Sequence, residues 1–129
     1  KVADGFAAAL EELRRAAAGR GTAAGREALA AEMRVAEAAA IHFQSCTNQA
    51  RFVIARRALA TAKPEDAPSH RETLRRVLRD EIALARRLYA IQTRDSRIGF
   101  EASNQYYYVP LDLVEKVLNC RDLLARLGG

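Results

Sequence analysis

The chain has 129 residues, a length that fits one domain with a buried core and leaves no room for a separate catalytic domain beside a regulatory one. Alanine, leucine and arginine are abundant while prolines and aromatic residues are few, a balance that favours helix over sheet. The net charge is +5, but acidic residues are interspersed with arginines along the chain, so a nucleic-acid partner is not expected. No apolar run reaches the ~18 to 20 residues that span a bilayer, so no membrane partner is expected either.

The sequence begins at Lys1 without an initiating methionine, and its first residues already follow a helical pattern. We therefore expect residues 1–129 to form a single helical domain that is a fragment of a larger chain. The sequence assigns no compartment.

Two amphipathic helices are predicted in the first half of the chain. Apolar residues recur at spacings of three and four over residues 4–18, and the glycines of residues 19–21 end this helix. The same period over residues 24–61 predicts a second helix, long enough that we expect a kink near residues 45–48. Its predicted packing seam consists of Leu29, Met33, Ala36, Ala40, Phe43, Thr47, Ala50 and Ile54.

A third helix follows a short connection that contains Pro64 and Pro68. Ser69 and Glu72 form a capping box, which predicts that the helix begins at Ser69 and continues to about residue 93. Because the connection is short, helices two and three should pack antiparallel. The seam residues Phe43, Ala50 and Ile54 should then meet the apolar face of helix three, which includes Leu74, Val77, Leu84 and Leu88.

Residues 94–109 abandon the helical period and contain three tyrosines and a phenylalanine, so we expect an ordered loop that buries its rings. Pro110 suits the first position of a last helix, and Asp112 lies in its positive first turn. The predicted apolar stripe of this helix consists of Leu111, Val114, Leu118, Leu124 and Leu127. The predicted fold is all-α: a four-helix, bundle-like arrangement with two long antiparallel helices and an ordered loop before the last helix.

A polar patch is predicted in the middle of the second helix, where His42, Ser45 and Gln49 share one face. It is interpreted as a hydrogen-bonded network that fixes helix register, or as a docking surface. A nucleophilic Ser45 activated by His42 is the alternative, but no orienting acid or oxyanion donor accompanies it. Glu81 interrupts the apolar stripe of helix three and needs a partner, either an arginine such as Arg51 or a loop amide, unless it serves as an acid or base with a raised pKa.

The sequence shows no complete active site. His42, His70 and scattered carboxylates form no cluster at ligand spacing, so neither a metal nor a cofactor is expected and no catalytic residue is assigned. Asp95 and Glu101 would suit glycosidic chemistry only at a separation that the sequence does not give. We expect the isolated chain to lack glycosidase activity.

One segment resembles a known class of proteins. Residues 95–108, DSRIGFEASNQYYY, together with the following VPLDLVEKVLNC, resemble the C-terminal end of large bacterial glycoside-hydrolase-like proteins, and residues 42–53 look similar to their preceding helix. The resemblance implies a helical region that follows a barrel-type catalytic domain with hexosaminidase-like or glucuronidase-like relatives, in a secreted or periplasmic parent. That pattern has histidine where this chain has Gln105, so no imidazole role is carried over, and no catalytic acid can be matched.

Two functions follow from these observations. The first is an accessory helical module that packs on the catalytic barrel of a carbohydrate-processing parent and contributes loop 95–108 to a sugar site. The substrate-binding candidates are Asp95, Arg97, Glu101, Asn104, Tyr106 and Tyr107, because aromatic rings stack on sugars while polar groups bind hydroxyls. The alternative is a helical protein–protein interaction module that uses the arginine-rich face formed by Arg71, Arg75, Arg79 and Arg86.

Overall fold

The computed structural model describes residues 1–17, 21–99 and 109–128. Over these ranges the chain forms helices without strands: α1 (Val2–Ala17), α2 (Ala23–Thr61), α3 (Ala67–Gln92) and α4 (Pro110–Arg126). The all-α, bundle-like arrangement is therefore confirmed. In the part of the chain that the structure describes, no helix is long and apolar enough to cross a membrane.

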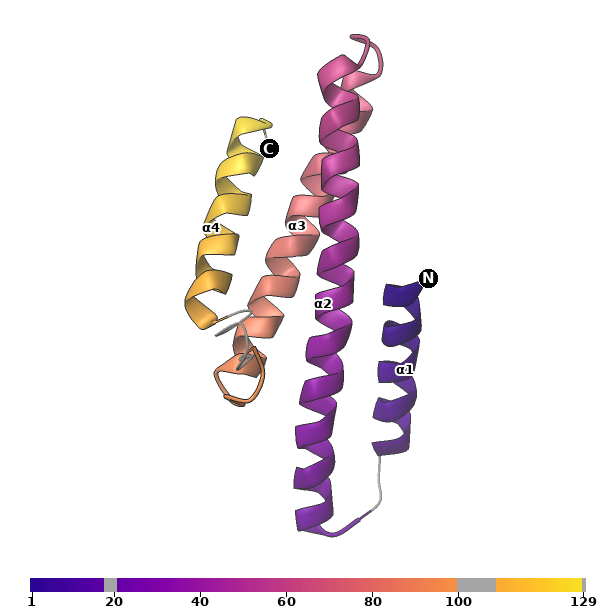
Figure 1. The fold of residues 1–129 in the computed structure, drawn as a ribbon, viewed down its shortest axis with the longest axis vertical. Helices are drawn as coiled ribbons and strands as arrows, with labels where there is room; N and C mark the ends of the chain where they lie inside the picture. Colours follow the sequence, from indigo (N-terminus) through magenta and orange to yellow (C-terminus); the bar gives the residue numbers. More distant parts are fainter. Residues whose placement is uncertain (18–20, 100–108, 129) are drawn as a thin grey trace, which may run out of the picture.

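The helices pack in the order in which they occur along the chain. α2 is the longest, with 39 residues, and stands between α1 on one side and α3 on the other, while α4 packs on α3 (Figure 1). α2 and α3 run antiparallel, as their short connection requires. The backbones of α2 and α4 do not approach each other within the described ranges, so only side chains join them.

The connection between α1 and α2 is stabilised at the beginning of α2. Gly21 has a φ of 118°, which a residue with a Cβ rarely adopts, and the Thr22 side chain accepts a hydrogen bond of 3.2 Å from Gly25 N. α2 then continues as an unbroken helix through residues 45–48, where the sequence predicted a kink, and Figure 1 shows no sharp bend in this helix. Ser45 and Asn48 of this segment donate hydrogen bonds to Glu81 of α3, whereas the Thr47 hydroxyl donates to the Phe43 carbonyl one turn earlier in α2.

The face of α2 that packs on α3 differs from the predicted seam. Its buried residues are Ala38, Ile41, Ser45, Asn48 and Ala55. Phe43 instead stacks on Phe6 of α1, with ring centroids 4.3 Å apart, while Ala50 is exposed and Ile54 is 68% exposed. The expected contacts of Ala50 and Ile54 with α3 are therefore wrong. The apolar residues of α2 pack on two neighbouring helices, α1 and α3. The face toward α3 also includes the polar residues Ser45 and Asn48, which a search for apolar periodicity does not detect.

The predicted start of helix three is also corrected. α3 begins at Ala67, so Ser69 lies inside its first turn, and the cap position belongs to Asp66. Pro68 occupies the first turn, where its missing N–H costs nothing and its fixed φ suits a helix. Ser69 and Glu72 therefore form no capping box.

α4 begins at Pro110, as predicted, and the Asp112 carboxylate accepts a hydrogen bond of 3.1 Å from Val109 N. The first three residues of the predicted apolar stripe, however, point away from the protein: Leu111 is 73% and Leu118 59% exposed, and Val114 is exposed as well. The last two, Leu124 and Leu127, are half-buried. The buried residues of α4 are Leu113, at 2% exposure, and Cys120. α4 thus carries two apolar stripes, and the one that packs on α3 contains a lysine.

The hydrophobic core lies where α2, α3 and α4 meet. Its buried members are Ala38, Ile41, Ala85, Leu88, Ile91 and Leu113, with Leu84, Ile98 and Val117 packed against them. This core holds the middle of α2 and fixes the positions of the polar side chains described next.

Candidate functional site

Five polar side chains from three helices meet beside the core, and we call them the Glu81 cluster: Ser45, Asn48 and Gln49 of α2, Glu81 of α3 and Lys116 of α4. Ser45 and Asn48 are one helical turn apart, so both face α3. Glu81 lies opposite them in the apolar face of α3. Lys116 follows Leu113 by one turn of α4 and contacts both Ser45 of α2 and Glu81 of α3.

The Glu81 carboxylate accepts hydrogen bonds on both oxygens. Ser45 Oγ donates to Oε1, Asn48 Nδ2 donates to Oε2 at 3.1 Å, and Lys116 forms an ion pair with Oε1. Lys116 Nζ also donates to Ser45 Oγ at 2.9 Å. Glu81 and Lys116 neutralise each other, which meets the need of a buried carboxylate for a partner. The partners are Lys116, Ser45 and Asn48, whereas Arg51, suggested from the sequence, is exposed.

The structure brings Ser45 and Gln49 of the predicted polar patch together with Glu81, the candidate on helix three. Gln49 Nε2 lies 3.4 Å from Ser45 Oγ. His42 borders the same small hollow as Ser45 and Glu81. Its Nε2 lies 3.7 Å from Cys46 Sγ, and its ring packs edge-on against the Phe43 ring. The cluster links three helices through hydrogen bonds and one ion pair.

Sequence reasoning missed Asn48 and Lys116. Asn48 is 1% exposed, and its Oδ1 is buried without a hydrogen-bond partner. A signal for Lys116 was present, because it interrupts the stripe of Leu113, Val117 and Cys120 just as Glu81 interrupts the stripe of α3. Two opposite charges that each interrupt an apolar stripe are candidates for pairing.

The thiol of Cys120 lies in the same region. Burial raises its pKa, and the neighbouring Glu81 carboxylate raises it further. Cys120 is a free thiol that is held in its protonated form more firmly than an exposed one.

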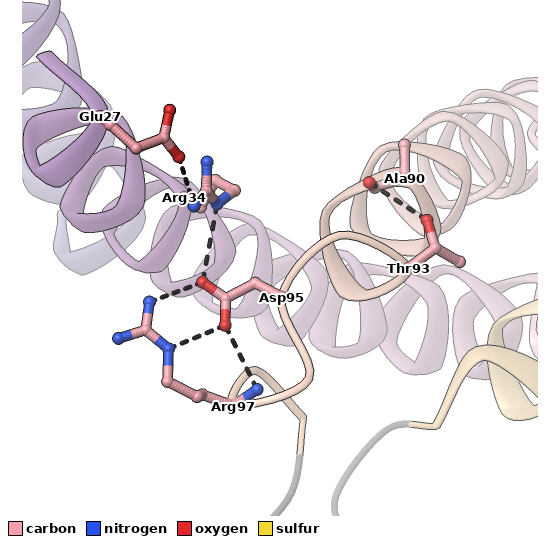
Figure 2. Close-up of polar contacts among 6 residues, drawn as sticks. All are labelled: Glu27, Arg34, Ala90, Thr93, Asp95 and Arg97. Atoms are coloured by element: carbon pink, nitrogen blue, oxygen red, sulfur yellow. Dashed lines mark hydrogen bonds and ion pairs between the residues drawn. The ribbon is translucent and has the colours of Figure 1, made fainter. Parts of the chain in front are cut away.

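A second polar group surrounds Asp95, just after α3 (Figure 2). Its carboxylate accepts hydrogen bonds from Arg97 Nε at 2.8 Å, Arg97 Nη2 at 2.6 Å and Arg97 N at 3.3 Å. Arg34 Nε of α2 lies 3.6 Å from Asp95 Oδ2, and Arg34 Nη2 lies 3.8 Å from Glu27 Oε1. The Arg97 hydrogen bonds hold the pKa of Asp95 well below its usual range. Asp95 therefore joins the turn after α3 to α2.

A hollow of about 390 Å³ adjoins this turn, and we call it the Arg97 hollow. Its lining residues are Val35, Ala38, Ala39, His42, Phe43, Leu88, Gln92, Arg97, Ile98 and Gly99. It therefore combines an apolar wall with an imidazole, an amide and a guanidinium. Of the substrate-binding candidates, Arg97 lines this hollow, and Asp95 holds Arg97.

The other substrate-binding candidates, Glu101, Asn104, Tyr106 and Tyr107, lie outside the described residues. The expectations of an ordered loop and of hydrogen bonds at Glu101 and Asn104 lie outside them as well. Within the described ranges, no group of three or more histidine, cysteine, aspartate or glutamate side chains could hold a metal ion.

The arginines on the arginine-rich face of α3 differ in their contacts within the chain. Arg75 donates to the carbonyls of Leu127 and Gly128, and so ties the end of α4 to α3. Arg79 lies 3.6 Å from Glu72, which Arg75 also contacts. Arg86 is exposed and lies beside the exposed apolar stripe of α4.

Comparisons of the chain with known protein families, with curated protein sequences and with solved structures find no match.

Proposed function

We propose that this chain is an accessory helical module of a carbohydrate-processing, glycoside-hydrolase-like protein, and that the Arg97 hollow belongs to a sugar site. The observation that carries the proposal is the place of this hollow: it forms where residues 97–99, part of the segment that resembles such proteins, meet α2 and α3. Its volume of about 390 Å³ falls within the ~300 to 1,000 Å³ of small-molecule sites.

The lining of the hollow suits a sugar. The Phe43 ring and the neighbouring aliphatic side chains offer apolar surface to the C–H face of a pyranose, while Gln92, His42 and Arg97 offer hydrogen-bonding groups to hydroxyls. The two hydrogen bonds that the Arg97 guanidinium donates to the Asp95 carboxylate orient it before any ligand binds. A guanidinium also fits the carboxylate of a uronic acid, the sugar of glucuronidase-like relatives.

Packing on a catalytic barrel is supported by the outward face of α4. Leu111, Val114 and Leu118 are exposed at helical spacing, and Tyr89 of α3 extends the same surface. Contiguous exposed apolar surface favours a covering partner. The alternative, an arginine-rich interaction face, has less support because Arg75 and Arg79 are engaged within the chain.

A titration of the ¹⁵N-labelled chain with glucuronic acid and with N,N′-diacetylchitobiose, followed by amide chemical shifts, tests the sugar site. We expect saturable shifts at Ala39, His42, Ile98 and Gly99. Val35→Trp should abolish them by filling the hollow, whereas Ala60→Trp, an exposed position on α2 away from it, should not. Shifts that scatter over the surface, or that persist in Val35→Trp, contradict the proposal.

The domain context has its own test. The coding sequence on the N-terminal side of Lys1 should show the alternating strand and helix pattern of a barrel. A different pattern there contradicts the parent that we propose.

A further inference from the structure

The net positive charge of the chain is concentrated at one end of the α2–α3 hairpin. Residues 51–79 contain eight basic and three acidic side chains, so they account for the whole net charge of +5, whereas the remaining residues contain thirteen of each kind. They form the last part of α2, the short connection and the first half of α3. Figure 1 shows that this end of the hairpin extends beyond the ends of α1 and α4, so it is a basic projection.

Five cations of this projection are exposed and have no carboxylate at ion-pair distance among the described residues. We call them the hairpin cations: Arg56, Arg57, Lys63, Arg71 and Arg76. Elsewhere in the chain many cations are paired, as Arg87 is with Glu37 and Arg97 is with Asp95. A group of like charges without counter-charges creates a positive potential that attracts an anionic partner.

The directions of the hairpin cations disfavour a flat anionic membrane as that partner. Consecutive residues of a helix project about 100° apart, so Arg56 and Arg57 point to different sides of α2, and a flat surface would contact only some of the cations. Glu65 and Asp66 are exposed in the connection, so an anionic surface that approached the hairpin end-on would meet two carboxylates first. A thin, flexible polymer can follow the sides of both helices and avoid these carboxylates.

The composition of the projection disfavours a nucleic acid. Phe52 is the only phenylalanine, tyrosine or tryptophan of residues 51–79, and it is half-buried with the Arg56 guanidinium 6.0 Å from its ring centroid, so no exposed ring of this segment can stack on bases. Double-stranded DNA carries one charge per ~1.7 Å of its axis. Arg71 and Arg76, by contrast, are roughly 7.5 Å apart along α3. This sparse spacing suits a polymer with one charge on each sugar ring.

We propose that the hairpin cations bind a linear polyuronate, a polysaccharide with a carboxylate on each sugar. An arginine guanidinium can donate two parallel hydrogen bonds to one carboxylate, which suits a surface made mainly of arginines. The negative charge of the partner is inferred from the hairpin alone, whereas its sugar nature rests on the proposed function. The hairpin cations share no residue with the Arg97 hollow, so the polymer is held at a separate place on the chain.

Polygalacturonate and its methyl ester test the charge dependence, because the ester has the same backbone without the charges. In calorimetric titrations of the full chain, polygalacturonate should bind, its affinity should fall steeply as salt is added, and the ester should not bind. Duplex DNA at the same salt concentration is the third probe and should bind more weakly than polygalacturonate. Absence of polygalacturonate binding, equal binding of the ester, or tighter binding of DNA would overturn the proposal.

Val35→Trp separates this proposal from the sugar site. The substitution fills the Arg97 hollow and should leave polygalacturonate binding unchanged. Loss of that binding in a folded Val35→Trp chain would assign the polymer to the hollow and contradict the role of the hairpin cations.

Two double variants with the same loss of charge test the location. Arg57→Gln/Arg71→Gln removes two hairpin cations and should weaken polygalacturonate binding roughly fivefold. Arg86→Gln/Arg94→Gln removes two exposed arginines outside residues 51–79 and should weaken it by less than about twofold. Circular dichroism reports the fold of both. Equal weakening in the two variants would mean that only the net charge matters, and would refute the assignment to the hairpin.

Discussion

Lys116 of α4 donates a hydrogen bond of 2.9 Å to Ser45 of α2, although the backbones of these two helices do not approach each other. The same ammonium pairs with Glu81 of α3. One lysine side chain therefore joins three helices, and it does so from within a stripe that otherwise packs on α3 through apolar contacts.

Replacing Lys116 by methionine should destabilise the chain by about 3 to 5 kcal/mol, because it leaves the Glu81 carboxylate buried without a counter-charge. Urea unfolding measures the loss. Lys63→Met, at an exposed lysine in the α2–α3 connection, is the control and should cost almost nothing. The double variant Glu81→Gln/Lys116→Met should recover part of the stability, since no charge remains buried. A Lys116→Met chain as stable as the parent would contradict the role of the ion pair.

The two apolar stripes of α4 predict very different losses of stability for the same leucine-to-alanine substitution. Leu113→Ala should cost roughly 2 to 5 kcal/mol, because a buried leucine leaves a cavity in the core. Leu111→Ala, two residues earlier on the outward face, should change the free energy of unfolding by no more than about 0.5 kcal/mol. Thermal or urea unfolding of the two variants tests which face of α4 packs on α3. A larger loss of stability in Leu111→Ala than in Leu113→Ala would mean that the helix packs through its other face.

The Asp95 ion pair predicts a pH dependence. Because its folded pKa lies below the ordinary value of 3.8, Asp95 contributes stability that is fully present above about pH 4 and is lost as the pH falls toward the folded pKa. Asp95→Asn should therefore be less stable than the parent at pH 7, and the difference should shrink between about pH 4 and pH 2.

Urea midpoints measured across that range provide the test for Asp95. Asp80→Asn, at an exposed aspartate on α3, is the matched control, and its difference from the parent should stay near zero throughout. A difference between Asp95→Asn and the parent that does not change with pH would show that the carboxylate is not stabilised as described.

Much of the fold could be predicted from the sequence because helix ends are local features. Pro110 marks the start of α4, and the glycines after residue 18 separate two periodic segments. The face of each helix was harder to predict. α4 carries one apolar stripe through Leu111 and Leu118 and another through Leu113 and Cys120, and periodicity does not distinguish them.

The candidate site could likewise be predicted only in part, because its contacts depend on which helix faces pack together. Glu81 could be singled out because a carboxylate in an apolar stripe needs a partner, but the identity of that partner depends on how α4 is placed. An arginine on α2 was a reasonable expectation from abundance alone. Lys116 is 35 residues further along the chain, and only the packing of α4 on α3 brings it to Glu81.

The packing of the helices in chain order also determines which helices can unfold separately from the rest. The backbone of each described helix contacts only those of its neighbours in sequence, as in a row of repeats, so stability is expected to follow nearest-neighbour cooperativity. α1, at one end of the row, can then separate from α2 without disturbing the interface between α3 and α4. At the other end, the Lys116 bonds extend cooperativity across two interfaces, so α4 cannot leave α3 without also releasing its hold on α2.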